Sequence, residues 1–180
     1  MYLALDQSPK RIGFAYGTGL GAPGSGRLML DVEPLTQLRN WLNLMMLTKG
    51  VTHVGYEAPF VGPKTRHDIL FRMVELPAII KLCCLDAGVP CEAVPPPTWR
   101  KHFIGFGRCP KGIKKSTQHL KDAAMMACNE RNWPIASDDE ADALGILDYL
   151  LSRDFPSYGT STTELFAGHS NERATELPGG

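Results

Sequence analysis

The sequence predicts an α/β fold in which a mixed five-stranded β-sheet is flanked by helices. Three short apolar runs near the N-terminus are separated by polar or glycine-rich turns, as expected of consecutive strands. Beyond them, segments with apolar residues at helical spacing alternate with two more strand-like runs, an order typical of a sheet covered by helices. The 180 residues, of which 43% are hydrophobic and 21% charged, are enough for one domain with a sizeable core.

The first three strands are predicted at residues 2–6, 12–16 and 27–32. A polar, proline-containing turn, Gln-Ser-Pro-Lys, separates the first two strands, and a glycine-rich loop over 17–26 separates the second from the third. Because consecutive strands with short connections usually pair with each other, we expect an antiparallel meander.

The remaining elements alternate between helices and strands. A helix should begin at Pro34 and end at Gly50, because proline is tolerated in the first turn and glycine is a common C-terminal cap. The long helix expected over 67–87 contains Pro77, so a kink or a break near residue 76 is predicted. The other elements are strands over 51–57 and 91–94, a brief helix over 98–104, a helix over 115–131, and a final helix that starts after the N-cap Ser137 and runs to about 152.

Composition also narrows the cellular setting. No stretch approaches the roughly 18 apolar residues of a membrane span, and the N-terminus lacks the features of a secretory signal. The five cysteines show neither a disulfide framework nor zinc-site spacing, which indicates reduced thiols. We therefore expect a cytoplasmic protein with no membrane partner. From residue 156 the chain is rich in Ser, Thr and Gly, so we expect one domain over 1–155 and a disordered tail over 156–180.

Charge is distributed unevenly along the chain, although the formal net charge is zero. Residues 99–121 carry seven Lys and Arg side chains and no Asp or Glu, whereas residues 137–154 carry six acids and a single Arg. A basic surface beside an acidic site suits a protein that holds a phosphodiester next to metal ions.

Four carboxylates occupy positions that favour a metal site. Asp6 closes the first strand and Glu57 closes the strand over 51–57, so they meet at one sheet edge if these strands are neighbours. Asp139 and Asp142 are three residues apart and project from one face of the final helix. Convergent carboxylates repel one another unless cations lie between them, and their hard oxygens select Mg²⁺ or Mn²⁺. Two such ions about 4 Å apart can activate water and stabilise the leaving oxygen of a phosphodiester.

Each acid also has a plainer interpretation. Asp6 could cap a turn, Glu57 could pair with a lysine, and the acids at 138–142 could complement the dipole of the helix. Asp138 lies one residue before Asp139 and forms an i, i+4 pair with Asp142, so the sequence leaves open which of the two is the third ligand.

Three short motifs, LALDQS, VGYEAPF and DEADALGI, follow one another in the chain. In order and spacing they resemble the motifs of the RuvC family of Holliday-junction resolvases, in a bacteriophage-type version, over about residues 1–152. The resemblance implies a ribonuclease H-like fold and a crossover-junction endodeoxyribonuclease of DNA recombination and repair, in a bacterial or phage-infected bacterial cell. It also implies that Asp6, Glu57, Asp139 and Asp142 are catalytic and hold two Mg²⁺ (or Mn²⁺) ions.

The resemblance further implies contacts to branched DNA. Phe60 matches an aromatic residue that stacks on a base near the cut, and such stacking contributes about 1–3 kcal/mol per base. Lys115 matches a lysine that neutralises the phosphate in the transition state. A core position for Phe60 and a solvated helix face for any single lysine are the alternatives. The predicted DNA-binding residues are Phe60, Arg100, Lys101, Arg108, Lys114 and Lys115.

A symmetric junction resolvase needs two active sites, so we expect a homodimer. The helix over 67–87 is the predicted interface, because its apolar residues cover more of the circumference than the roughly 100° stripe that one core contact requires. These residues are Ile69, Leu70, Met73, Leu76, Ile79, Ile80, Leu82 and Leu85. The competing functions are a nuclease of the same fold that cuts RNA–DNA hybrids or flap and fork DNA, and a non-catalytic DNA-binding module.

Overall fold

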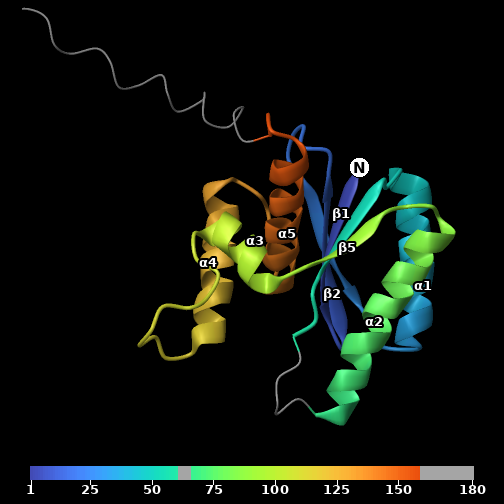
Figure 1. The fold of residues 1–180 in the computed structure, drawn as a ribbon, viewed down its shortest axis with the longest axis horizontal. Coiled ribbons are helices and arrows are strands. Elements are labelled where there is room, and N and C mark those ends of the chain that lie inside the picture. The colour runs from blue at the N-terminus through green and yellow to red at the C-terminus, as the bar shows by residue number, and fades with distance from the viewer. Residues whose placement is uncertain (61–65, 159–180) are drawn as a thin grey trace, which may run out of the picture.

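The computed structural model describes residues 1–60 and 66–158. In these ranges five strands form one sheet with five helices around it (Figure 1), which confirms the predicted α/β class. The strands are β1 (Tyr2–Ser8), β2 (Arg11–Gly17), β3 (Gly24–Met29), β4 (His53–Glu57) and β5 (Cys91–Val94). The helices are α1 (Pro34–Lys49), α2 (His67–Asp86), α3 (Pro96–Ile104), α4 (Ser116–Glu130) and α5 (Asp138–Asp154).

The sheet is mixed, with the strand order β3-β2-β1-β4-β5. β1, β2 and β3 pair antiparallel, so the predicted meander is confirmed. β1, β4 and β5 pair parallel, with β1 at the centre of the sheet. The carboxyl ends of β1 and β4 therefore lie side by side at one edge of the sheet.

The third strand lies earlier in the chain than predicted, over Gly24–Met29 instead of 27–32. Part of the glycine-rich loop belongs to the sheet, where Gly24 pairs with Tyr16 and Gly26 with Phe14. A Cβ at Gly24 would lie 2.4 Å from the Tyr16 ring, and a Cβ at Gly26 would lie 2.5 Å from the Phe14 ring. The glycines thus leave room for both rings to lie across β3. The strand therefore starts at Gly24, where this cross-strand packing begins.

Helices cover both faces of the sheet. α1 and α2 lie on one face, and α3, α4 and α5 lie on the other (Figure 1). Side chains of β1 alternate between the two layers: Leu3 and Leu5 belong to the core under α1 and α2, whereas Ala4 belongs to the core under α5. Asp6 follows Ala4 by two residues, so its carboxylate is on the α5 side.

The predicted end of α1 is found in the structure, whereas a break in α2 is not. α1 ends at Gly50, which adopts the left-handed conformation with a φ of 60°. α2 runs unbroken through Pro77, so of the kink or break predicted near residue 76 the break does not occur, and the kink stays a prediction. Pro77 is buried beside Leu76 and Ile80, and this packing holds the helix on both sides of the one backbone hydrogen bond that proline cannot make.

α5 is the central helix of its layer. It begins after Ser137, as predicted, because the Ser137 Oγ accepts a hydrogen bond from the Glu140 backbone N–H at 3.3 Å. The Ser137 hydroxyl also donates to the Glu140 carboxylate at 3.0 Å. Nearly all residues from Asp139 to Leu151 are buried, so the position of α5 on the sheet is closely determined.

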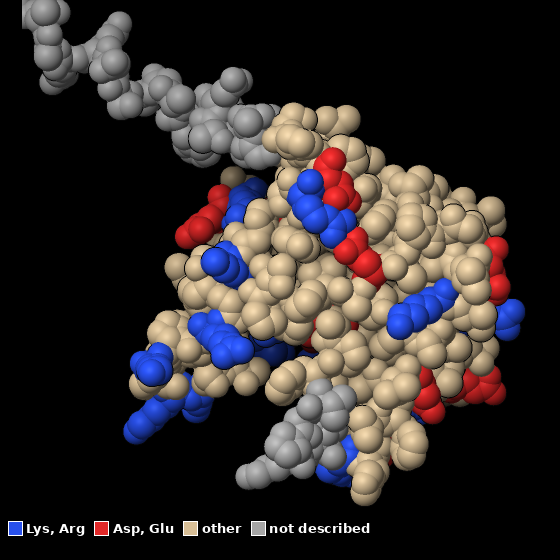
Figure 2. Space-filling model, viewed as in Figure 1, with Lys and Arg blue, Asp and Glu red and all other residues tan. Residues whose placement is uncertain are grey.

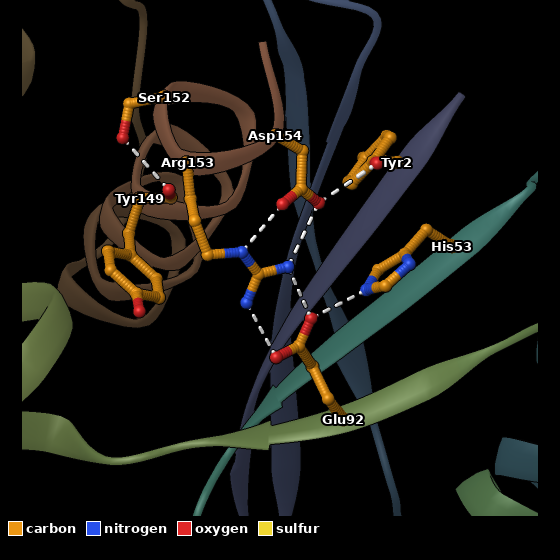
Figure 3. A network of polar contacts seen from close by, with 7 residues as sticks. All are labelled: Tyr2, His53, Glu92, Tyr149, Ser152, Arg153 and Asp154. Atoms are coloured by element: carbon orange, nitrogen blue, oxygen red, sulfur yellow. Dashed lines mark hydrogen bonds and ion pairs between the residues drawn. The ribbon is translucent and has the colours of Figure 1, made fainter. Parts of the chain in front are cut away.

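A polar network fixes the other end of α5 to the sheet, at the edge away from Asp6 (Figure 3). Arg153 donates to both oxygens of Glu92 on β5 at 2.7 Å, and to Asp154 at 2.6 and 2.9 Å. His53 on β4 lies 2.8 Å from the Glu92 carboxylate, and the Tyr2 hydroxyl donates to Asp154 at 3.0 Å. The network therefore connects α5 with β1, β4 and β5.

Three further expectations concern the whole chain. The five cysteines are free thiols, as predicted. No helix in the described ranges is long and apolar enough to cross a membrane. The predicted tail over 156–180 lies mostly outside the described residues, so the domain boundary at 155 stays a prediction. Tyr158 is described, and its hydroxyl donates to Asp148 of α5 at 3.0 Å.

Candidate active site

β1 and β4 bring the first two acids together. The parallel register pairs Leu5 with Tyr56, so Asp6 and Glu57 follow at equivalent positions on neighbouring strands. The Gln7 side-chain amide donates to the Glu57 backbone oxygen at 3.0 Å and ties the two strand ends to each other. The predicted meeting of the two residues at one sheet edge is thus confirmed.

Gly13 lets the start of α5 reach the same edge. It pairs with Asp6 across β1 and β2, and an added Cβ would lie 2.0 Å from the Asp139 backbone oxygen. Any other residue at this position would hold the helix away from the sheet. Asp139 and Asp142 lie in this contact, with only 4% and 6% of their surfaces exposed.

Asp138 lies differently from its neighbour Asp139. Its carboxylate is partly exposed and forms an ion pair with Lys121 of α4. Asp139 is buried, forms an ion pair with Arg11 of β2, and is among the charges that raise the pKa of Asp6. The geometry therefore favours Asp139 as the acid that shares a site with Asp6.

Burial and mutual repulsion disfavour the ionised forms of these acids. Burial, followed by repulsion from Glu57, Asp142 and Asp139, raises the pKa of Asp6 well above its usual range. Burial also raises the pKa of Glu57. Burial and the Glu57 charge raise the pKa of Asp142 to about 7. Buried carboxylates that resist ionisation in this way fit a site that takes up divalent cations, which remove the repulsion.

In the structure, basic side chains form ion pairs with these acids. The Arg100 guanidinium of α3 is 3.2 Å from Glu57 Oε1 and 3.9 Å from Asp142 Oδ2. Within the described residues, no three His, Cys, Asp or Glu side chains are arranged to hold a metal ion as they stand. The donor types fit Mg²⁺ or Mn²⁺, but the carboxylates must turn away from their present partners to hold one.

Several of these contacts were not predicted from the sequence. Trp99 is buried in the core, and its indole N–H donates to Glu57 Oε1 at 3.1 Å. Arg100, which was predicted to bind DNA, lies against two of the acids, and its contact to DNA stays a prediction. Arg11 and Lys121 were not singled out. In the sequence, Arg11 is only a basic side chain at the start of β2 and Lys121 only one of several in the basic segment. Neither position identifies a partner from another element.

The other predicted phosphate contacts lie on the surface. Lys101, Arg108, Lys114 and Lys115 are exposed, and none forms an ion pair within the described part of the chain. Lys115 precedes α4 in the left-handed conformation, with a φ of 59°. In Figure 2, Lys and Arg side chains gather over the side of the molecule formed by α3, α4 and the loop between them. This basic side borders the edge that carries the acids.

Phe60 is 78% exposed, so the alternative of a core position is wrong. It lines a small pocket of about 120 Å³ that also touches Glu57, Gln7 and Met73. An exposed aromatic ring next to a catalytic candidate is available to stack on a base, whereas a packing role would have required burial.

Comparisons with known proteins agree with this architecture. A scan of protein-family models and a search of the curated proteins each gave no match. Among solved structures, Thermus thermophilus RuvC matches with a TM-score of 0.61 and 15% identity, over 85% of this chain and 95% of that one. T. thermophilus RuvC in complex with a Holliday junction substrate matches with a TM-score of 0.61 and 13% identity, over 86% and 95%. The yeast mitochondrial Holliday junction resolvase Ydc2 matches with a TM-score of 0.51 and 10% identity, over 91% and 85%.

At such low identities the likeness concerns the fold. The mixed five-stranded sheet with its five helices matches the fold of T. thermophilus RuvC over most of both chains. This chain therefore has the RuvC-like variant of the ribonuclease H-like fold.

Proposed function

We propose that the protein is a metal-dependent endonuclease that cuts phosphodiesters of branched DNA, with Holliday junctions as its preferred substrate. The observation that carries the proposal is the meeting of Asp6, Glu57, Asp139 and Asp142 at the sheet edge bordered by the exposed basic side chains of α3 and α4. The fold shared with junction resolvases supports the same substrate class.

The four acids would hold two Mg²⁺ or Mn²⁺ ions. When bound, such ions supply an activated water and neutralise the leaving oxygen of the phosphodiester. The chain itself positions the substrate: Lys101, Arg108, Lys114 and Lys115 bind backbone phosphates, and Phe60 stacks on a base beside the cut.

The proposed active form is a homodimer that uses α2. Two of the predicted interface residues, Leu76 and Ile80, lie in the core of the single chain and are unavailable to a partner. An exposed apolar stripe remains along the outer side of α2, formed by Phe71, Val74, Leu82 and Leu85. Sedimentation at micromolar concentration tests the dimer, and a monomer both with and without junction DNA would contradict it.

Cleavage of matched substrates tests the function. Four-way junction, fork, RNA–DNA hybrid and linear duplex of the same sequence should be incubated with the protein and Mg²⁺, with EDTA as the control. We expect the junction to be cut fastest and no cutting in EDTA. Faster cutting of the fork or the hybrid would assign the site to a different substrate, and equal cutting in EDTA would contradict the metal site. Comparing Asp138→Asn with Asp139→Asn then decides which acid is the third ligand.

A further inference from the structure

Lys121 reaches the acidic site from a different helix than the acids themselves. It lies on α4, and its ammonium forms an ion pair with the Asp138 carboxylate at the start of α5. The side chain is 28% exposed, so the ammonium lies at the rim of the site instead of in free solvent. α4 therefore supplies a positive charge to a group of carboxylates that β1, β4 and α5 supply.

The influence of Lys121 extends over the whole group of acids. Its charge lowers the pKa of Asp6, Glu57 and Asp142, in each case against the larger effect of burial. Arg100, by comparison, contacts Glu57 and Asp142. Lys121 thus partly offsets the charge of several acids at once, although Arg100 has the larger effect on Glu57 and Asp142.

A lysine suits a counterion that must move. Its ammonium is compact and lies on a flexible stem, whereas the guanidinium of arginine forms fixed, planar contacts. In the described residues no three potential ligands are arranged to hold an ion, and basic side chains are paired with several of the acids. Metal uptake therefore requires that some of these cations leave.

We propose that Lys121 is the resident counterion of the acidic site when no divalent cation is bound, and that a metal ion must displace it to bind. The inference rests on the metal site of the proposed function. Two like charges cannot share one group of carboxylates without repulsion, so Lys121 weakens metal binding while it stabilises the metal-free protein.

Metal titration of the DNA-free, full-length protein tests the displacement. Lys121→Met removes the charge and keeps most of the apolar stem, Lys121→Arg keeps the charge, and Lys101→Met removes a charge from an exposed lysine outside the site. We expect Lys121→Met to bind Mn²⁺ roughly tenfold more tightly than wild type by calorimetry, a change of about 1.4 kcal/mol. Lys121→Arg and Lys101→Met should stay within about twofold of wild type. In EDTA, Lys121→Met should unfold at a lower temperature, and Mn²⁺ should raise that temperature more than it does for wild type.

The direction of the change in Mn²⁺ affinity distinguishes a counterion role of Lys121 from a structural role, because damage to the site would weaken metal binding. Unchanged or weaker Mn²⁺ binding by both Lys121→Met and a second neutral variant, Lys121→Gln, would overturn the displacement. Tighter binding by either folded variant supports it. Failure of the wild-type protein to bind Mn²⁺ at all would instead overturn the metal site itself, and with it the proposed function.

Discussion

Gly13→Ala tests whether the contact between β2 and the start of α5 sets the geometry of the acidic site. The new Cβ would lie 2.0 Å from the Asp139 backbone oxygen and 2.4 Å from its carbonyl carbon. Both neighbours are backbone atoms, so a side-chain rotation cannot relieve the clash. Restoring an ordinary contact of about 3.4 Å requires that α5 and β2 separate by roughly 1.4 Å at this point.

The expected consequences are a loss of stability and a larger loss of activity. Overpacking of this kind costs about 1–3 kcal/mol of folding free energy. A displacement of about 1 Å of a catalytic group can lower the rate about 100-fold. Urea unfolding and single-turnover cleavage of a four-way junction at saturating Mg²⁺ measure the two effects.

Gly17→Ala is the matched control on the same strand. Its Cβ would meet its nearest neighbour, the Leu147 side chain, at an ordinary 3.5 Å. We expect this variant to fold and cleave nearly as the wild type does. Cleavage by Gly13→Ala at the wild-type rate would refute the conclusion that Gly13 positions the acids.

Three other predictions follow from the same structure. In EDTA the protein should be more stable at about pH 5.5 than at about pH 8, because the pKa of Asp142, raised to about 7 by burial and Glu57, gives stability that is lost as the pH rises through that value. Thermal unfolding of Asp142→Asn should show a weaker pH dependence, and an equal slope would contradict the prediction. Glu92→Gln should lower the free energy of unfolding at neutral pH by about 1 kcal/mol, because Arg153 holds the pKa of Glu92 below its usual range. That difference should fade as the pH falls through the lowered pKa, and a wild-type urea midpoint at neutral pH would count against it. Phe60→Ala should weaken junction binding by about 1–3 kcal/mol without changing the unfolding temperature, as fluorescence anisotropy and thermal melts can show; the opposite pattern would indicate a packing role.

Local patterns predicted most of the fold. Apolar periodicity and the caps at Gly50 and Ser137 placed the helices, because these signals depend on the residues within each element. The start of β3 was wrong, because it depends on Tyr16 and Phe14 of another strand, whose rings need glycines opposite them. Of the two alternatives predicted near residue 76, the break does not occur, because tertiary packing of α2 outweighs the local cost of proline.

The candidate site shows the same contrast between features set within one element and features set by packing between elements. Asp6 and Glu57 could be predicted because a carboxylate that ends an apolar strand is conspicuous in the sequence, and the pairing of β1 with β4 then brings them together. The partners of the acids could not be predicted. Arg11 and Lys121 reach α5 from β2 and α4, so their contacts exist only once three separate elements have packed together.

The central claim is that the carboxylates at the ends of β1 and β4 and the start of α5 hold the metal ions that cut DNA. Glu57→Gln tests it most directly, because it removes one charge and keeps the shape of the side chain. With Mg²⁺ and a four-way junction, this variant should bind the junction with wild-type affinity and cut it about 100- to 1,000-fold more slowly, by analogy with the loss of one strong transition-state contact. Cleavage by Glu57→Gln at a rate close to that of the wild type would contradict the account.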